Sequence, residues 1–186
     1  MFIQTEITPN PATLKFLPGQ QVMPSGTADY TTTEEGAQSP LAGRLFAVAG
    51  VCGVFLGHDF ITVTKEPDTD WDGIKPALLG AIMDHFQSGE PVVIGATEGG
   101  HAETGDGEDA GIIDQIKELL DTRVRPAVAQ DGGDITFHGF DRGIVYLAMK
   151  GACAGCPSST LTLKMGIENL LRHYIPEVSE VRPVAP

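Results

Sequence analysis

The chain has 186 residues, of which 41% are hydrophobic, so it has enough apolar material for one ordinary core or two small ones. Its formal net charge of −13 argues against direct binding to nucleic acid, because that affinity rests mainly on lysine and arginine side chains that neutralise phosphates. The longest uncharged apolar run, residues 45–57, is shorter than the ~20 residues that cross a bilayer, so no membrane span is expected.

The first half of the chain, residues 1–94, predicts a small mixed α/β domain. Residues 2–7 and 12–17 favour strands on either side of a Thr-Pro-Asn-Pro turn, since a residue that precedes proline avoids the helical region. Residues 50–57 and 60–65 are rich in β-branched and aromatic side chains and are joined by a short polar turn. This pattern predicts a β-hairpin.

Two helices are expected in the same half. Residues 39–49 favour a short helix with Ser39 as its N-cap and a proline in the first turn. A longer helix is predicted over residues 70–89, where Gly89 ends it. A spacing of four places one apolar stripe along this helix, formed by Ile74, Leu78, Ile82 and Phe86.

Residues 95–109 form a predicted linker. They include five glycines and five acidic residues, and none of their apolar side chains is larger than that of alanine, so they cannot contribute to a core. Charge also changes here: residues 1–109 carry 4 basic and 16 acidic groups, whereas residues 110–186 carry 8 and 9. The two halves therefore present different surfaces.

The second half, residues 110–186, predicts an α-β-β-α-β domain, so the whole chain is expected to be α+β. Its first helix should be kinked or restarted by Pro126 and has an apolar stripe of Ile112, Ile116, Leu119 and Leu120. Residues 134–140 and 143–150 favour two strands joined by a turn. A second helix over residues 159–174 and an edge strand over residues 177–184 complete the order.

Two cysteines, Cys153 and Cys156, lie three positions apart on the connection from the second strand to the second helix. Such a pair can close a disulfide, hold half of a zinc site or hold half of an iron-sulfur site. Pro157 suits the first position of a helix, and a helix N-terminus is expected to lower the pKa of nearby thiols. Gly155 has no side chain and can take backbone angles that other residues resist, so the loop leaves room for a bulky inorganic group to approach.

The number of ligands is the next constraint, because zinc and cuboidal iron-sulfur sites usually take four protein ligands. Cys52, the third cysteine, lies in an apolar strand and is expected to be a buried structural residue. His173 has no second histidine at zinc-finger spacing and is expected to be solvated or to cap its helix. The simplest source of two more thiolates is a second copy of the chain across a two-fold axis, an arrangement that suits a 4Fe-4S cube.

The sequence resembles a known family at this point. Residues 124–178, with the Asp-Gly-Gly-Asp turn and the loop Gly-Ala-Cys-Ala-Gly-Cys-Pro-Ser-Ser, resemble the NifU C-terminal (Nfu) domain. Residues 7–16, 39–51 and 54–65 resemble the N-terminal domain of Nfu proteins. The resemblance covers nearly everything outside the linker.

The resemblance implies an iron-sulfur carrier rather than an enzyme. A homodimer would hold a 4Fe-4S cluster through Cys153 and Cys156 of each chain, receive it from a scaffold protein and deliver it to apo iron-sulfur enzymes. No catalytic residue is implied, and Cys52 matches no cluster ligand of the family. Asp131 and Asp134 match the turn motif, where we expect them to shape the turn rather than to contact the cluster.

Two alternatives and a location complete the predictions. The cysteine pair could serve a thiol-disulfide oxidoreductase, or it could hold zinc in a purely structural dimer. Three cysteines without an export signal at the start of the sequence favour a reducing compartment. We expect the bacterial cytoplasm, with the mitochondrial matrix as the alternative for a processed chain.

Overall fold

The computed structural model describes residues 1–95, 107, 109–154 and 157–184. The chain divides into two compact units, Met1–Gly99 and Gly100–Pro186, and each has its own sheet and helices. This mixed architecture confirms the predicted α+β fold class. Most of the predicted linker, residues 96–106 and 108, lies outside the described residues, so the linker and domain bounds stay predictions. None of the described helices is long and apolar enough to cross a membrane.

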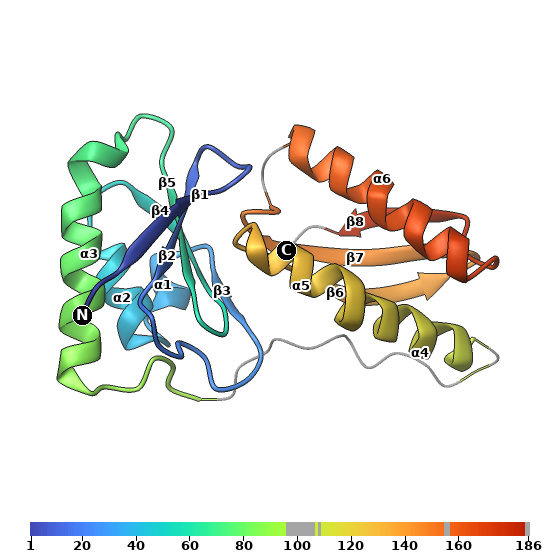
Figure 1. Ribbon diagram of the computed structural model, residues 1–186, viewed down its shortest axis with the longest axis horizontal. Helices are drawn as coiled ribbons and strands as arrows, with labels where there is room; N and C mark the ends of the chain where they lie inside the picture. The colour runs from blue at the N-terminus through green and yellow to red at the C-terminus, as the bar shows by residue number, and fades with distance from the viewer. Residues whose placement is uncertain (96–106, 108, 155–156, 185–186) are drawn as a thin grey trace. The chain divides into compact units, whose positions relative to one another are not determined.

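The first unit is built on a five-stranded antiparallel sheet in the order β1-β2-β5-β4-β3. Its strands are β1 (Gln4–Ile7), β2 (Thr13–Leu17), β3 (Ala28–Tyr30), β4 (Val51–Leu56) and β5 (Ile61–Lys65). Its helices are α1 (Thr33–Gly36), α2 (Pro40–Phe46) and α3 (Trp71–Ser88), as Figure 1 shows. The two predicted strand pairs and the two predicted helices are present; β3 and α1 were not predicted.

Local capping explains where the helices of this unit begin and end. The Ser39 hydroxyl accepts a hydrogen bond from the amide of Ala42 at 3.0 Å, which satisfies one free donor of the first turn of α2. Gly89 has a φ of 70°, a left-handed conformation that suits glycine and ends α3. Both terminal signals were predicted from the sequence.

The second unit has a three-stranded sheet in the order β6-β7-β8, flanked by two helical segments. The chain runs through α4 (Ala110–Leu119), a π-helical turn η1 (Leu120–Val124), α5 (Arg125–Gln130), β6 (Gly133–Asp141), β7 (Ile144–Gly151), α6 (Pro157–Tyr174) and β8 (Glu180–Val184). β6 and β7 are antiparallel, and β8 pairs with β7 in parallel as the predicted edge strand. The restart expected at Pro126 takes the form of η1, after which α5 begins with this proline in its first turn.

One core holds the second unit together. Alternate residues of β7 are buried, because successive side chains of a strand point to opposite faces. They pack in one cluster with side chains from both helical segments: Val145, Leu147, Met149, Ile116, Leu120, Ile167 and Leu171. The β7–α6 connection is therefore attached at both ends to well-packed elements.

His85 is an unusual member of the first unit's interior. Ile74, Leu78 and Ile82 of the predicted α3 stripe are buried and Phe86 packs half-buried against the same core. His85, which was not predicted as part of the stripe, is 0% exposed. Neither ring nitrogen of His85 has a hydrogen-bond partner. Burial, and after it the charge of Arg44, lowers the pKa of His85, while Glu90 acts in the opposite direction. The folded unit therefore holds this ring neutral.

We predict that His85 makes the first unit acid-sensitive. The unfolded chain takes up the proton first, near the ordinary pKa of 6.5, so the stability contributed by neutral His85 is present above that pH and is lost as the pH falls below it. The slope reaches at most about 1.4 kcal/mol per pH unit. Urea denaturation followed by the fluorescence of Trp71, the single tryptophan, should show a flatter pH dependence for His85→Phe. His58→Gln, which removes an exposed histidine of the same unit, is the control; an unchanged slope in His85→Phe would contradict the prediction.

Candidate functional site

The cysteine loop lies between the end of β7 at Gly151 and the start of α6 at Pro157. Cys153 is 6% exposed, and its side chain belongs to the core cluster of the second unit. Cys156, the other predicted ligand, and Gly155 lie outside the described residues. The structure therefore places one of the two predicted ligands, and α6 begins at the predicted proline.

Hydrogen bonds to three neighbouring elements hold the described part of this loop. The amide of Ala152 donates to the carbonyl oxygen of Gly132 at 3.2 Å, and the amide of Ala154 donates to that of Gly151 at 3.1 Å. The hydroxyl of Thr160, in the first turn of α6, donates to the carbonyl oxygen of Cys153 at 3.1 Å. The backbone around Cys153 is thus attached to the glycine turn, to β7 and to α6.

The Asp-Gly-Gly-Asp turn, residues 131–134, lies directly against Cys153. Gly132 has a φ of 81°, a conformation that favours glycine. Gly133 has a different reason to lack a side chain, because a Cβ there would lie 2.5 Å from the Cys153 Sγ and 2.8 Å from the carbonyl oxygen of Lys150. The second glycine therefore allows the thiol to pack against the first residue of β6. The sequence suggested a turn here but did not suggest this contact.

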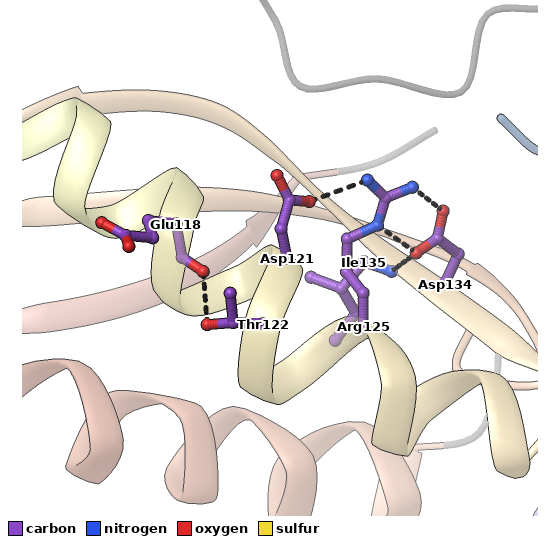
Figure 2. A network of polar contacts seen from close by, with 6 residues as sticks. All are labelled: Glu118, Asp121, Thr122, Arg125, Asp134 and Ile135. Carbon is purple, nitrogen blue, oxygen red and sulfur yellow. Dashed lines mark hydrogen bonds and ion pairs between the residues drawn. The ribbon is translucent and has the colours of Figure 1, made fainter. Parts of the chain in front are cut away.

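The two aspartates of the turn differ. Asp131 is exposed at the end of α5, whereas Asp134 is only 4% exposed. Both carboxylate oxygens of Asp134 accept hydrogen bonds at 2.8 Å from the Arg125 guanidinium, and Oδ1 also accepts one at 2.8 Å from the amide of Ile135 (Figure 2). Asp134 thus helps to shape the turn and to hold the start of β6. Arg125 was missed, because nothing in a nine-residue separation indicates a contact between the two side chains.

The electrostatics of Cys153 differ from the prediction. Burial, followed by the charges of Asp131 and Asp134, raises the pKa of Cys153 to about 12. The expectation that a helix N-terminus lowers this pKa is therefore wrong for Cys153. Desolvation disfavours the thiolate more strongly than the helix end stabilises it.

Cys52 and His173, which were not expected to be ligands, both lie in the described part of the chain. Cys52 is exposed, not buried as predicted, because it lies at a register shift in the pairing of β4 with β5, between Val51 and Gly53. His173 is exposed near the end of α6, as expected, with its ring edge-on to Tyr174. Among the described residues, no three His, Cys, Asp or Glu side chains come together in a group that could hold a metal ion.

Comparison with known proteins identifies the family. A model described as "Scaffold protein Nfu/NifU N terminal" matches residues 3–89, and one described as "NifU-like domain" matches residues 116–182. A human protein named "NFU1 iron-sulfur cluster scaffold homolog, mitochondrial" is 52% identical over 185 residues, which cover 99% of this chain and 72% of that protein. The chain belongs to the Nfu/NifU family. The resemblance inferred from the cysteine loop and its flanks is confirmed.

Other members of the Nfu/NifU family show similar relationships. "NifU-like protein 4, mitochondrial" of Arabidopsis thaliana is 50% identical over 184 residues, which cover 97% of this chain and 65% of that protein. The solution structure of a NifU-like protein from Saccharomyces cerevisiae is 31% identical and covers 50% of this chain and 84% of its own, with a TM-score of 0.46. That structural likeness is too low to carry an argument here.

The predicted location in the bacterial cytoplasm is wrong. The human and Arabidopsis relatives are both named as mitochondrial proteins. Cysteine usage could not separate the two locations, because free thiols are compatible with any reducing compartment.

We predict that Gly133→Ala disrupts the loop. The added methyl group collides with the Cys153 Sγ and the Lys150 backbone, and overpacking of this kind costs about 1–3 kcal/mol. Gly139→Ala is the matched control in the same strand, because its Cβ would meet nothing closer than a Tyr146 ring atom at 3.9 Å. Urea denaturation followed by circular dichroism should give a lower midpoint for Gly133→Ala than for Gly139→Ala. Equal midpoints would show that the contact is unimportant.

Proposed function

We propose that this protein is an iron-sulfur cluster carrier that binds a 4Fe-4S cluster between two copies of the chain and transfers it to apo-proteins. Cys153 and Cys156 of each copy would be the ligands. The observation that carries the proposal is a cysteine loop held by hydrogen bonds in a chain whose human relative is named an iron-sulfur cluster scaffold homolog. Among the described residues no three His, Cys, Asp or Glu side chains form a group that could hold a metal ion within one copy. The cluster is cargo here rather than a resident cofactor.

The ligand count supports a shared site. A 4Fe-4S cluster usually takes four cysteine thiolates, one for each iron, and one copy of the loop brings two. A two-fold axis through the cluster repeats the same loop from a second copy and completes the set. No catalytic residue is assigned, since the protein carries out ligand exchange rather than a chemical conversion of a substrate.

The buried position of Cys153 suggests how loading proceeds. A buried thiol with a raised pKa is protonated before the cluster binds, and a cluster ligand is a thiolate, so loading must release the proton of Cys153. In the loaded dimer, a site formed by two loops would be open to thiolates of an acceptor, which can then replace the carrier's ligands one at a time.

The partners follow from this transfer chemistry. The donor would be a scaffold protein that builds the cluster, and the acceptors would be apo iron-sulfur enzymes with free cysteine ligands. The names of the relatives support a mitochondrial location for these partners.

The thiol-disulfide oxidoreductase is less well supported. An attacking cysteine of such an enzyme needs a thiolate at neutral pH, and the pKa of Cys153 is raised to about 12. The loop also follows an antiparallel hairpin, β6 and β7, rather than a βαβ unit. A zinc-bridged structural dimer uses the same ligand count, so metal analysis has to separate it from the carrier.

We predict that Cys153→Ser and Cys156→Ser each abolish cluster binding, because two serines replace two of the four thiolates in a symmetric dimer. After anaerobic reconstitution with ferrous iron and sulfide, the visible absorption band and the bound iron should be lost in both. Cys52→Ser is the control and should load like the unaltered chain. Cluster loss in Cys52→Ser alone would refute the proposed ligand set, and stoichiometric zinc in a colourless protein would favour the structural dimer.

We also predict that dimerisation depends on loading. The half-sites are joined mainly through the cluster, so removal of iron should return the protein to a smaller species. Sedimentation velocity of the empty and loaded protein at one concentration measures this directly. Identical sedimentation of the two forms would contradict the coupling.

A further inference from the structure

An ion pair between Arg125 and Asp134 joins α5 to the start of β6. Neither residue belongs to the proposed ligand set. Arg125, in the first turn of α5, donates from Nε and one terminal nitrogen to the two carboxylate oxygens of Asp134, each at 2.8 Å. Its other terminal nitrogen donates to Asp121 Oδ1 at 3.0 Å. The side chain of Asp134 is 5% exposed and that of Arg125 is 22% exposed, so water screens this pair little. Figure 2 shows the guanidinium between the two carboxylates.

We propose that Arg125 is a positioning residue for Cys153, acting through Asp134 and Gly133. The proposal rests on the proposed function, in which Cys153 is a cluster ligand. Arg125 itself would touch neither the cluster nor the thiol.

The path from Arg125 to the thiol is short and consists of packed groups. Arg125 and the amide of Ile135 hold the Asp134 carboxylate from two sides, which fixes the start of β6. The preceding residue, Gly133, is the one against which the Cys153 Sγ packs. In the sheet, Gly133 pairs with Gly151 and Asp134 pairs with Lys150, so the same two residues also hold the end of β7 from which the loop departs.

Charge gives Arg125 a second part in this arrangement. A cluster ligand must be a thiolate, and the buried carboxylate of Asp134 belongs to the residue next to Gly133, against which the Cys153 Sγ packs. The guanidinium offsets the charge of Asp134 at hydrogen-bond distance. Without Arg125, a buried carboxylate would lose its bidentate cationic partner close to the thiolate, which is unfavourable for the loaded state.

Alternative tasks for this ion pair are less consistent with its surroundings. An anion bound at Arg125 would have to compete with the carboxylates of Asp134 and Asp121, which already accept hydrogen bonds from all three guanidinium nitrogens. A purely helical role would be served by the exposed i, i+4 contact with Asp121, which does not require Asp134. The bidentate contact to the start of β6 therefore points to the loop.

The test compares the lifetime of the cluster in four variants of the full chain. Arg125→Met removes the positive charge and the two-point contact with Asp134, and Arg125→Lys keeps the charge without that two-point contact. Arg125→Met combined with Asp134→Asn removes both charges. Arg123→Met is the matched control. It removes the same charge two residues before Arg125, and the Arg123 side chain lies over the Tyr174 ring. Each protein is reconstituted anaerobically with ferrous iron and sulfide, and the decay of visible absorption after addition of an iron chelator is followed.

We expect Arg125→Met to lose its cluster about 10- to 100-fold faster than the unaltered chain, the usual effect of removing a group that orients a metal ligand. Arg125→Lys and the double variant should each recover part of the lifetime, and Arg123→Met should retain all of it. Recovery in the double variant traces the loss to the uncompensated charge of Asp134, and it supports the positioning role when the urea midpoints of Arg125→Met and the double variant, measured without cluster, do not show the same recovery. Circular dichroism at the assay temperature verifies that the variants are folded.

The outcomes separate this inference from the proposed function. If the unaltered chain takes up no cluster, the proposed function fails and the role of Arg125 fails with it. If the unaltered chain loads and Arg125→Met keeps its cluster equally long, only the role of Arg125 is refuted. Should Arg125→Met not fold, Arg125→Lys decides: a shortened lifetime supports the positioning role, and an unchanged one overturns it.

Discussion

The number of sulfur donors is the constraint on which the rest of the account depends. One chain carries two cysteines on the β7–α6 loop, and in the part of the chain that the structure describes no group of metal-binding side chains surrounds Cys153. Four thiolates are needed for a cube of iron and sulfide. A second copy of the same loop is the most economical source, and a site shared in this way can also be opened for transfer.

The fold prepares one half of such a site. Gly133 allows the thiol of Cys153 to pack against the start of β6, and hydrogen bonds from Ala152 and Thr160 hold the backbone around it. Burial raises the pKa of Cys153 and so keeps its thiol protonated, the form that oxidises less readily. In the proposed loading step Cys153 must give up this proton to become a thiolate ligand.

The features that the sequence predicted well are those that depend on near neighbours. Ser39 caps α2 and Gly89 ends α3 through contacts within a few residues, and the order of strands and helices around the cysteine loop follows from apolar periodicity. What could not be predicted depends on tertiary packing. The exposure of Cys52 follows from a register shift, and the raised pKa of Cys153 follows from burial that local sequence does not reveal.

Mass measurement under non-denaturing conditions tests the shared site most directly. Native mass spectrometry of the anaerobically loaded protein reports, for each species, how many chains accompany how many iron and sulfide ions. The account predicts that the cluster-bearing species contains two chains and one set of four irons and four sulfides. A single chain that carries the complete cluster would contradict it.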